Sequence, residues 1–188
     1  MNASTNPTAL QSKQWIYEAL FTLMSIKPYN SITISELTKK ADLSRRTFYR
    51  NFDSKDDVLQ YYLSKIVDEY TKRLLQYRTY TLEFSIELLL NLCRDHQHNL
   101  LILRDNHMLG LLLENWTRAL PQVHNTVLNH LQDFPEFNDQ EALEYLLAFN
   151  VGGTFNVMLK WINDGMVLSE KEVAHTLFHY TCQLSARN

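Results

Sequence analysis

Glycine, proline and cysteine are scarce in this chain, with only four, four and two copies among 188 residues. The shortage of helix breakers, together with abundant Leu, Tyr, Glu and Gln, favours an all-α fold, and no alternating pattern competes as a strand. Long uncharged runs are missing too, because residues such as Glu87, Arg94 and Arg104 interrupt the apolar stretches. Nothing approaches the roughly 20 apolar residues of a membrane span. With 45% hydrophobic residues the chain can bury a core, and we expect a soluble protein with no membrane partner.

The two cysteines, Cys93 and Cys182, are too few for a disulfide scaffold. Without a signal-peptide pattern, they indicate a reducing cytoplasm. Common catalytic motifs are absent as well: the sequence has no glycine-rich phosphate loop, no Gly-x-Ser-x-Gly and no His-Glu-x-x-His. We therefore predict a cytoplasmic protein that is not an enzyme and requires no cofactor.

Net charge is only −3, but the charges are unevenly distributed along the chain. Residues 1 to 78 hold 12 Lys and Arg against 8 Asp and Glu, a balance of +4. Residues 79 to 188 hold 6 against 13, a balance of −7. A cationic first part and an acidic remainder suit a protein that meets nucleic-acid phosphates with one end only.

Residues 32 to 59 carry the most informative pattern in the chain. Ile34, Leu37 and Ala41 follow each other at helical spacing, and Leu43 comes next in a turn. Ser44 then supplies an N-cap oxygen for a second short helix. Two short helices joined by a turn of about three residues predict a helix-turn-helix, the motif that places a helix in the DNA major groove.

The second of these helices, at about residues 44 to 51, is rich in cations. Phe48 and Phe52 should anchor it inward. The residues that should face outward are Arg45, Arg46, Thr47, Tyr49 and Arg50. Arginine binds guanine edges or phosphates with its forked guanidinium, so this face is suited to DNA. The alternative is that the three arginines form only a solvated helix face.

A further N-cap follows at once, since Ser54 precedes a long apolar-periodic segment and Asp57 lies three residues later. This is a capping box with Asp in place of the usual Glu or Gln. Lys55 and the free N–H groups of that first turn could then face a phosphate.

At these residues the chain resembles the TetR family of bacterial transcription regulators. The matching features are a Thr-opened helix, a Ser-capped recognition helix, Phe-Tyr-x-x-Phe and Ser-Lys-Glu/Asp. Here they are Thr33, Ser44, Thr47-Phe48-Tyr49-Arg50-Asn51-Phe52 and Ser54-Lys55-Asp56. The resemblance is specific over about residues 10 to 60, and a stretch from Gly152-Gly153-Thr154 to Gly165 adds a weaker one.

The sequence departs from the family pattern at two places. Arg46 stands where a glycine is common, which adds a cation at or near the DNA surface. The glycine usual after the first helix is replaced within Lys27-Pro28-Tyr29-Asn30, which changes only a turn. The resemblance implies a homodimer formed by the last two long helices, with Arg45, Arg46, Thr47 and Arg50 at bases. It implies Thr33, Ser44, Tyr49 and Lys55 at phosphates.

The expected architecture is all-α, with about nine helices in two domains. Residues 9–53 would form a three-helix DNA-binding domain, and residues 54–188 a helical domain for ligand binding and dimerisation. The helices outside the helix-turn-helix are predicted at about 9–26, 55–77, 82–95, 99–105, 107–131 with strain or a break at Pro121, 139–164 and 170–185. Phe134-Pro135-Glu136-Phe137 should be a loop, Gly165 a helix stop, and Ser169 with Glu172 a capping box.

Aromatic and flexible side chains of the second domain could line a cavity for a small-molecule effector. The candidates are Phe84, His107, Met108, Leu112, Trp116, Phe149 and Phe155. A plain packed core is the alternative for each of them. His175, His179 and Cys182 share one helical face that could hold zinc, although a dimer-facing stripe explains the same spacing. The spacing of Cys93, His96, His98 and His107 fits no standard zinc pattern, so we predict no metal site.

The function predicted from these features is a TetR-type transcriptional regulator that binds a palindromic DNA operator as a dimer, most simply as a ligand-responsive repressor. The alternative is a partner-dependent coactivator or protein-interaction module on the same fold. A repressor should bind DNA alone and release it with ligand, whereas a coactivator should need its partner.

Overall fold

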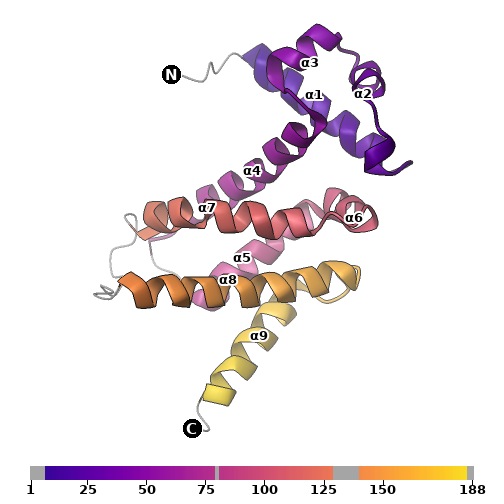
Figure 1. The fold of residues 1–188 in the computed structure, drawn as a ribbon. Helices are drawn as coiled ribbons and strands as arrows, with labels where there is room; N and C mark the ends of the chain where they lie inside the picture. Colours follow the sequence, from indigo (N-terminus) through magenta and orange to yellow (C-terminus); the bar gives the residue numbers. More distant parts are fainter. Residues whose placement is uncertain (1–6, 79–80, 129–139, 186–188) are drawn as a thin grey trace. The chain divides into compact units, whose positions relative to one another are not determined.

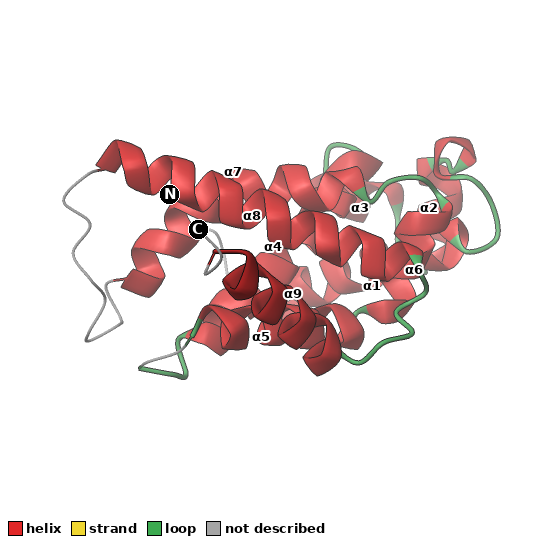
Figure 2. Ribbon diagram, turned by 90° about the horizontal axis from the view of Figure 1, so that it is seen from below, coloured by secondary structure: helices red, strands yellow, loops and turns green. Residues whose placement is uncertain are grey.

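The computed structural model describes residues 7–78, 81–128 and 140–185 (Figure 1). These residues form nine α-helices, one short 3-10 helix and no strand, which confirms the all-α prediction (Figure 2). The helices are α1 (Pro7–Met24), η1 (Tyr29–Ser31), α2 (Ile34–Lys40), α3 (Arg45–Asn51), α4 (Lys55–Leu74), α5 (Leu82–Asp95), α6 (Gln97–Asp105), α7 (Gly110–Leu128), α8 (Gln140–Asn163) and α9 (Glu170–Ser185).

The described residues divide into two compact units, and α4 contributes to both of them. The first unit contains the residues up to Lys65 together with 105–107, and the second contains 66–104 and the residues from Met108 onward. The predicted domain boundary between residues 53 and 54 falls just before α4. A functional division of the chain at that point remains a prediction.

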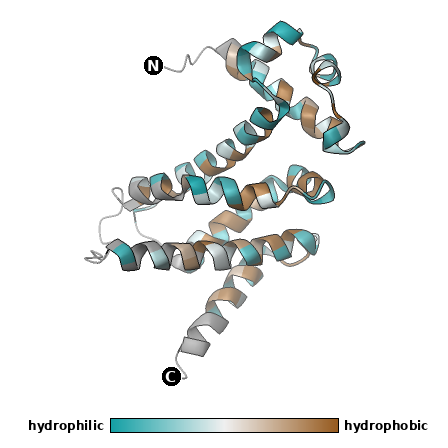
Figure 3. Ribbon diagram, in the orientation of Figure 1, coloured by the Kyte–Doolittle hydropathy of each residue, from teal (hydrophilic) through white to brown (hydrophobic). Residues whose placement is uncertain are grey.

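In the first unit, α1 packs against α2 and α3, and α2 packs against α3. Hydrophobic and hydrophilic stretches alternate along α1, as expected of an amphipathic helix (Figure 3). Ile16 and Leu20, one turn apart on α1, are fully buried with Leu37 of α2 and Phe48 of α3. The apolar side of each short helix therefore holds it in place, because helices of seven residues are not stable alone.

In the second unit, α5 packs against α9. Leu90 and Leu92 of α5 are buried, as are Val173 and Ala174 of α9. Cys93 lies in the same interior with its Sγ 3.4 Å from a methionine sulfur, that of Met158 on α8. Burial raises the pKa of the Cys93 thiol to about 12, so it is a packed, unreactive group.

The connection from α8 to α9 is built around a left-handed turn. Gly165 (φ +83°) and Met166 (φ +60°) end α8, which confirms the predicted glycine stop. Arg94 of α5 donates hydrogen bonds to the carbonyl oxygens of Met166 at 2.7 Å and Leu168 at 3.1 Å. Its guanidinium also pairs with Glu170 at the start of α9, so this one side chain contacts three residues of the connection.

The N-terminus of α9 has the capping box that the sequence predicts. The Ser169 N–H donates to Glu172 Oε2 at 2.8 Å, and the Glu172 N–H donates to Ser169 Oγ at 3.3 Å. The Ser169 hydroxyl also donates to Glu172 Oε2, at 2.6 Å, and this bond, followed by that from the Ser169 N–H, lowers the pKa of the Glu172 carboxyl. Two N–H groups at the helix start, which have no partner within the helix, are thereby satisfied.

The structure differs from the prediction for α7 at the start of the helix, and at Pro121 it contradicts the predicted break and leaves the predicted strain untested. The helix begins at Gly110 rather than at residue 107, because His107 has a left-handed conformation (φ +58°) and Met108 N–H closes α6 on the Leu103 carbonyl at 2.8 Å. It also continues through Pro121 without a break. A proline costs about 3 kcal/mol inside a helix. Trp116 and Val127, on either side of the proline, are buried, and burial of this kind is favourable to the helix. The predicted loop at residues 134–137 lies outside the described residues.

Candidate nucleic-acid interface

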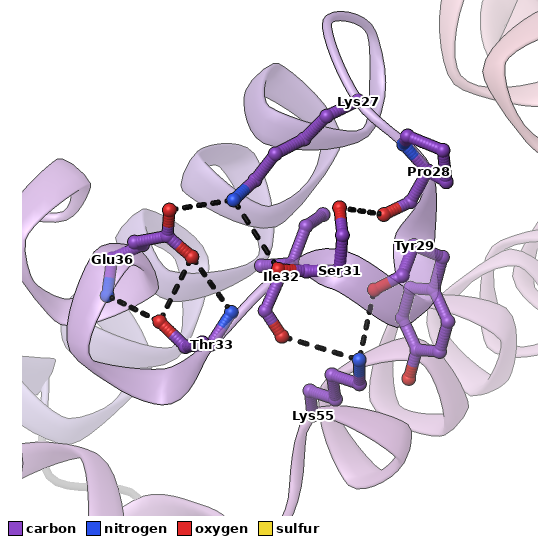
Figure 4. Close-up of polar contacts among 8 residues, drawn as sticks. All are labelled: Lys27, Pro28, Tyr29, Ser31, Ile32, Thr33, Glu36 and Lys55. Carbon is purple, nitrogen blue, oxygen red and sulfur yellow. Dashed lines mark hydrogen bonds and ion pairs between the residues drawn. The ribbon is translucent and has the colours of Figure 1, made fainter.

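The helix-turn-helix starts at a complete capping box. The Glu36 N–H donates to Thr33 Oγ1 at 3.3 Å, and the Thr33 N–H donates to Glu36 Oε2 at 2.9 Å. Glu36 also meets Lys27 Nζ at 2.6 Å, and the same ammonium donates to the Ser31 carbonyl at 3.3 Å (Figure 4). The hydrogen bond from Lys27 is the main reason that the pKa of Glu36 falls to about 2. Thr33 is therefore held as a helix cap at the entrance to the motif.

The turn between α2 and α3 closes α2 on itself. The Leu43 N–H donates to the Thr38 carbonyl at 3.0 Å, and Asp42 between them has a left-handed backbone (φ +53°). This is the pattern of a Schellman C-cap with Asp in the place that glycine usually takes. Thr38 itself is buried. The turn therefore sets the direction in which α3 leaves α2.

Ser44 caps α3 as predicted. Its Oγ accepts from the Thr47 N–H at 3.0 Å and lies 2.9 Å from the Thr47 hydroxyl. Asn51 Nδ2 donates to the Thr47 carbonyl at 2.8 Å and closes the other end of the helix. Phe48 and the C-cap residue Phe52 are buried, so one side of α3 is anchored. Of the five predicted DNA-contacting residues within α3, Thr47 is half-buried and the other four are exposed: Arg45, Arg46, Tyr49 and Arg50.

Tyr49 and Arg45 form a pair on the exposed side of α3. The Arg45 guanidinium carbon is 6.0 Å from the centre of the Tyr49 ring, one helical turn away. The Tyr49 ring in turn stands edge-on to Phe48, with centroids 5.4 Å apart. A cation at this distance from an aromatic face is held weakly. The ring thereby limits the directions that Arg45 can take.

Lys55, the predicted phosphate contact on α4, is engaged within the protein. Its Nζ donates to the carbonyl oxygens of Tyr29 at 2.8 Å and Ile32 at 3.2 Å (Figure 4). The ammonium also lies 4.3 Å from the centre of the Tyr29 ring. Lysine has three donors, so one is left for an external acceptor. The phosphate role of Lys55 stays a prediction, and the structure adds an internal role to it.

Tyr29 is the centre of this arrangement in the η1 turn. Its hydroxyl donates to Asp56 Oδ1, and its N–H donates to Asn106 Oδ1 at 2.9 Å. Asn106 Nδ2 also donates to the Met24 carbonyl at 3.2 Å. Burial, followed by the hydrogen bond to Asp56, raises the pKa of the Tyr29 hydroxyl well above its usual value. The phenol is therefore a constant donor.

The predicted capping box at the start of α4 is present. The Ser54 N–H donates to Asp57 Oδ2 at 2.8 Å, and the Asp57 N–H donates to Ser54 Oγ at 3.2 Å. The Asp53 N–H also donates to the same carboxylate oxygen, at 3.1 Å. The Asp57 carboxylate therefore already satisfies donors at the place where the sequence suggested a phosphate.

Three cations that were not among the predicted site residues lie in the helix-turn-helix or beside it. Lys13 Nζ lies 5.1 Å from the centre of the Tyr61 ring and 5.7 Å from that of Phe52, so it stands beside the C-terminal end of α3. Lys39 and Lys40 are exposed in the last turn of α2. Lys39 and Lys40 could have been chosen from the sequence, because they lie within the predicted helix-turn-helix. The position of Lys13 could not be predicted, because the two rings beside it belong to segments that meet α1 only in the fold.

The predicted ligand-binding residues do not form a single group. Trp116 and Phe155 are buried with ring centroids 5.8 Å apart, and Leu112 is buried as well. Phe84 packs on Tyr77 at 4.8 Å. The other three differ in exposure: Met108 is half-buried, His107 is exposed and Phe149 is 74% exposed. A ligand-binding role for the set stays a prediction, with Trp116 and Phe155 as its natural centre.

The histidines on α9 are arranged as a pair. The rings of His175 and His179 stack with centroids 5.5 Å apart, and His175 Nδ1 is 3.4 Å from Glu83 Oε1. The side chain of Cys182 lies outside the described residues. Across the ranges that the structure describes, no group of three or more His, Cys, Asp or Glu is placed to hold a metal ion. None of the helices in those ranges is long and apolar enough to cross a membrane.

Comparisons with known proteins concern the family of the N-terminal part and the fold of the chain. Residues 16–62 match the family model for bacterial regulatory proteins of the tetR family, which confirms the predicted resemblance. No curated protein matches the sequence. Among solved structures, the chain is similar to the dihydroxyacetone kinase operon activator DhaS, with a TM-score of 0.60 and 17% identity over 92% of this chain and 95% of that one. At this identity the likeness concerns the fold.

Proposed function

We propose that this chain, which has the fold of a TetR-family DNA-binding regulator with that family's N-terminal domain, binds a palindromic operator as a homodimer and represses transcription until an effector binds. The observation that carries the proposal is the two-sided character of α3. One side of this helix is anchored by the buried Phe48, whereas Arg45, Arg46 and Arg50 are exposed on the other. A rigid helix with exposed arginines is what major-groove recognition requires.

The proposed contacts fall into two classes. Arg45, Arg46, Thr47 and Arg50 read or flank bases, and Thr33, Ser44, Tyr49 and Lys55 position phosphates. Three further lysines extend the phosphate-contacting class: Lys13 beside the C-terminal end of α3, and Lys39 and Lys40 in the last turn of α2. Phosphate contacts fix the protein's register on the duplex, while base contacts give sequence specificity.

Two copies of the chain would place their α3 helices in successive major grooves, about 34 Å apart on one side of the duplex. The exposed aromatic residues Tyr145 and Phe149 of α8 support a dimer, since monomeric proteins rarely leave such side chains uncovered together. The complex would form in the cytoplasm, without catalysis.

An effector would bind among the aromatic side chains of the second unit, around Trp116 and Phe155. It could release the operator only by binding more tightly to the form of the dimer that fits DNA poorly. Coupling of this kind is usually worth about 1 to 3 kcal/mol.

The test is selection of bound sequences from random duplexes at several salt concentrations. Enrichment of a palindrome at nanomolar protein would support an autonomous dimeric reader. Arg50→Ala should relax the preference at one base position, whereas Arg118→Ala on α7 serves as the control. Retention of no duplex by the folded dimer would count against the proposal.

The similar solved structure is named as an operon activator, which keeps a second candidate function open. In this alternative the chain works as a coactivator on the same fold and needs a protein partner to bind DNA. The same selection separates the two candidates. If the chain is an activator that binds DNA alone, it would select a palindrome as a repressor does, and only the direction of regulation would differ from the first proposal. A partner-dependent protein would retain no duplex by itself.

A further inference from the structure

Two lysines and two tyrosines of the first unit form a cluster between α1 and α4. Lys13 and Tyr17 are one turn apart on α1, and Tyr61 and Lys65 are one turn apart on α4. The rings of Tyr17 and Tyr61 have centroids 6.4 Å apart. All four side chains are half-buried, and long side chains of this kind keep their polar ends in water. We call these four residues the α1–α4 cluster.

Both ammonium groups of the α1–α4 cluster lie over aromatic rings. Lys13 Nζ is 5.1 Å from the centre of the Tyr61 ring. Lys65 Nζ is 4.9 Å from the centre of the Tyr17 ring and 5.9 Å from that of Tyr61. Two positive charges therefore share the Tyr61 ring. Like charges held close together repel each other, so an anion that binds both of them would be favourable.

The polar groups of the α1–α4 cluster are donors without partners among the described residues. Neither ammonium forms an ion pair or a hydrogen bond within those ranges, and the hydroxyls of Tyr17 and Tyr61 have no hydrogen-bond partner there either. A lysine has three N–H donors and a tyrosine has one O–H. The cluster can therefore supply several donors to one external acceptor.

The Tyr17 hydroxyl keeps its proton beside these charges. Burial, followed by the negative charge of Glu18, raises the pKa of this hydroxyl, so it remains a donor at neutral pH. Glu18 itself is exposed, and its Oε1 accepts a hydrogen bond from Gln14 Nε2 at 2.9 Å. It weakens the positive potential next to Tyr17 but pairs with neither lysine of the cluster.

We propose that the α1–α4 cluster binds the phosphate group of a small phosphate monoester, with Lys13 and Lys65 supplying charge and Tyr17 and Tyr61 supplying hydroxyl donors. Such a group carries a charge of about −1.5 to −2 at neutral pH and has three acceptor oxygens, which suits two ammonium groups. A carboxylate or a DNA phosphodiester carries one charge and would leave one ammonium uncompensated. The rings already hold both ammonium groups in place, which reduces the entropy lost on binding.

Lys13 connects this site to DNA binding. Its Nζ is 5.7 Å from the ring of Phe52 at the C-terminal end of α3, where the proposed function assigns it to a DNA phosphate. One ammonium cannot serve a bound monoester and the operator at the same time, so the two ligands would compete for Lys13. This consequence rests on the proposed function, whereas the binding site does not. The monoester would lower DNA affinity from within the first unit.

The first experiment measures phosphate binding without DNA. Inorganic phosphate is titrated into the full-length protein at constant ionic strength, and the width of its phosphorus NMR line is followed. The wild type should broaden the line in a saturable way. Lys65→Met removes the charge but keeps an apolar chain over the Tyr17 ring, and it should weaken binding about 10-fold. Tyr17→Phe keeps the ring and removes one donor, so it should weaken binding about 5-fold.

Two further variants separate this site from the DNA-contacting surface. Lys40→Ala removes an exposed cation in the last turn of α2 and should leave phosphate binding at the wild-type level. Glu18→Gln removes the acid next to Tyr17 and should tighten binding about 2-fold. A general attraction of phosphate to positive charge would make Lys40→Ala and Lys65→Met equally weak, and that result would overturn the inference. Melting temperatures in chloride verify that each variant is folded.

The second experiment measures competition with DNA. Affinity for the selected palindrome is determined by fluorescence anisotropy in chloride and in phosphate of equal ionic strength. Phosphate at four times its dissociation constant should weaken wild-type binding about 5-fold for each protomer on the DNA, because competition scales as 1 + [L]/Kd. Lys65→Met should bind as the wild type does in chloride and lose only about 1.4-fold in phosphate, because its phosphate affinity is 10-fold lower.

The two experiments distinguish failure of the site from failure of the proposed function. Equal phosphate binding by the wild type and Lys65→Met would overturn the site, whatever the DNA result. Wild-type DNA affinity that did not respond to a bound phosphate would overturn the competition for Lys13. A protein that binds phosphate as expected but retains no duplex would support the site and count against the DNA-binding function.

Discussion

Lys55 Nζ donates a hydrogen bond to the carbonyl oxygen of Tyr29 at 2.8 Å and lies 4.3 Å from the centre of that residue's ring. Asp56, the next residue on α4, accepts the hydrogen bond of the Tyr29 hydroxyl. Two consecutive residues at the start of α4 thus hold both the backbone and the side chain of the turn that precedes α2. The direction of α2 relative to the N-terminal end of α4 is set by this contact.

Lys55→Ala should therefore lower the free energy of unfolding by about 1 to 2 kcal/mol, because two carbonyl oxygens lose their donor. Urea denaturation measures the change, with Lys40→Ala in the exposed last turn of α2 as the control. If stability stayed at the wild-type level while the number of counterions released on DNA binding fell by about one, Lys55 would be a phosphate contact and its internal hydrogen bonds would not stabilise the fold.

Lys13→Ala should weaken DNA binding about equally for all sequences and reduce the salt slope by about 0.9, because it removes one phosphate contact beside α3. Fluorescence anisotropy at several salt concentrations measures both quantities. Lys65 is the matched control, since its ammonium also lies over an aromatic ring, 4.9 Å from that of Tyr17, but ten residues into α4. An unchanged slope in Lys13→Ala would remove this residue from the interface.

The Tyr49 hydroxyl and ring can be separated by two substitutions. Tyr49→Phe should weaken binding evenly, by about 1 kcal/mol, if the hydroxyl donates to a phosphate. Tyr49→Ala should in addition change the base preference, because Arg45 loses the ring that lies 6.0 Å from its guanidinium. Sequencing of selected duplexes reports the preference. Identical base preferences in both variants would show that the ring does not guide Arg45.

Glu36 should stabilise the fold at neutral pH and lose this effect in acid. Its folded-state pKa is lowered to about 2, whereas the ordinary value is 4.5. The stabilisation is therefore complete above the ordinary pKa and is lost as the pH falls towards 2. Urea midpoints of the wild type and Glu36→Gln should differ at pH 6 and converge near pH 2. A difference that persisted at pH 2 would show that the carboxylate charge is not responsible, and Lys27→Met should behave like Glu36→Gln.

Much of the helix-turn-helix was predictable from the sequence, because its signals are local. A cap such as Ser44 acts on an N–H three residues later, and the inward position of Phe48 follows from helical spacing. The capping boxes at Thr33, Ser54 and Ser169 belong to the same class. The continuity of α7 through Pro121 was not predictable, because it depends on how much the helix buries on either side of the proline.

The sequence by itself determined the helical class, the capped helices and the cationic face of α3, since each depends on residues within one or two turns of each other. Only the tertiary structure decided that Lys55 is held by the η1 turn, that Lys13 stands beside Phe52, and that the glycines of α8 face open space. The first two facts join residues distant in the chain, and all three depend on the packing of the helices around each residue, which local sequence does not specify.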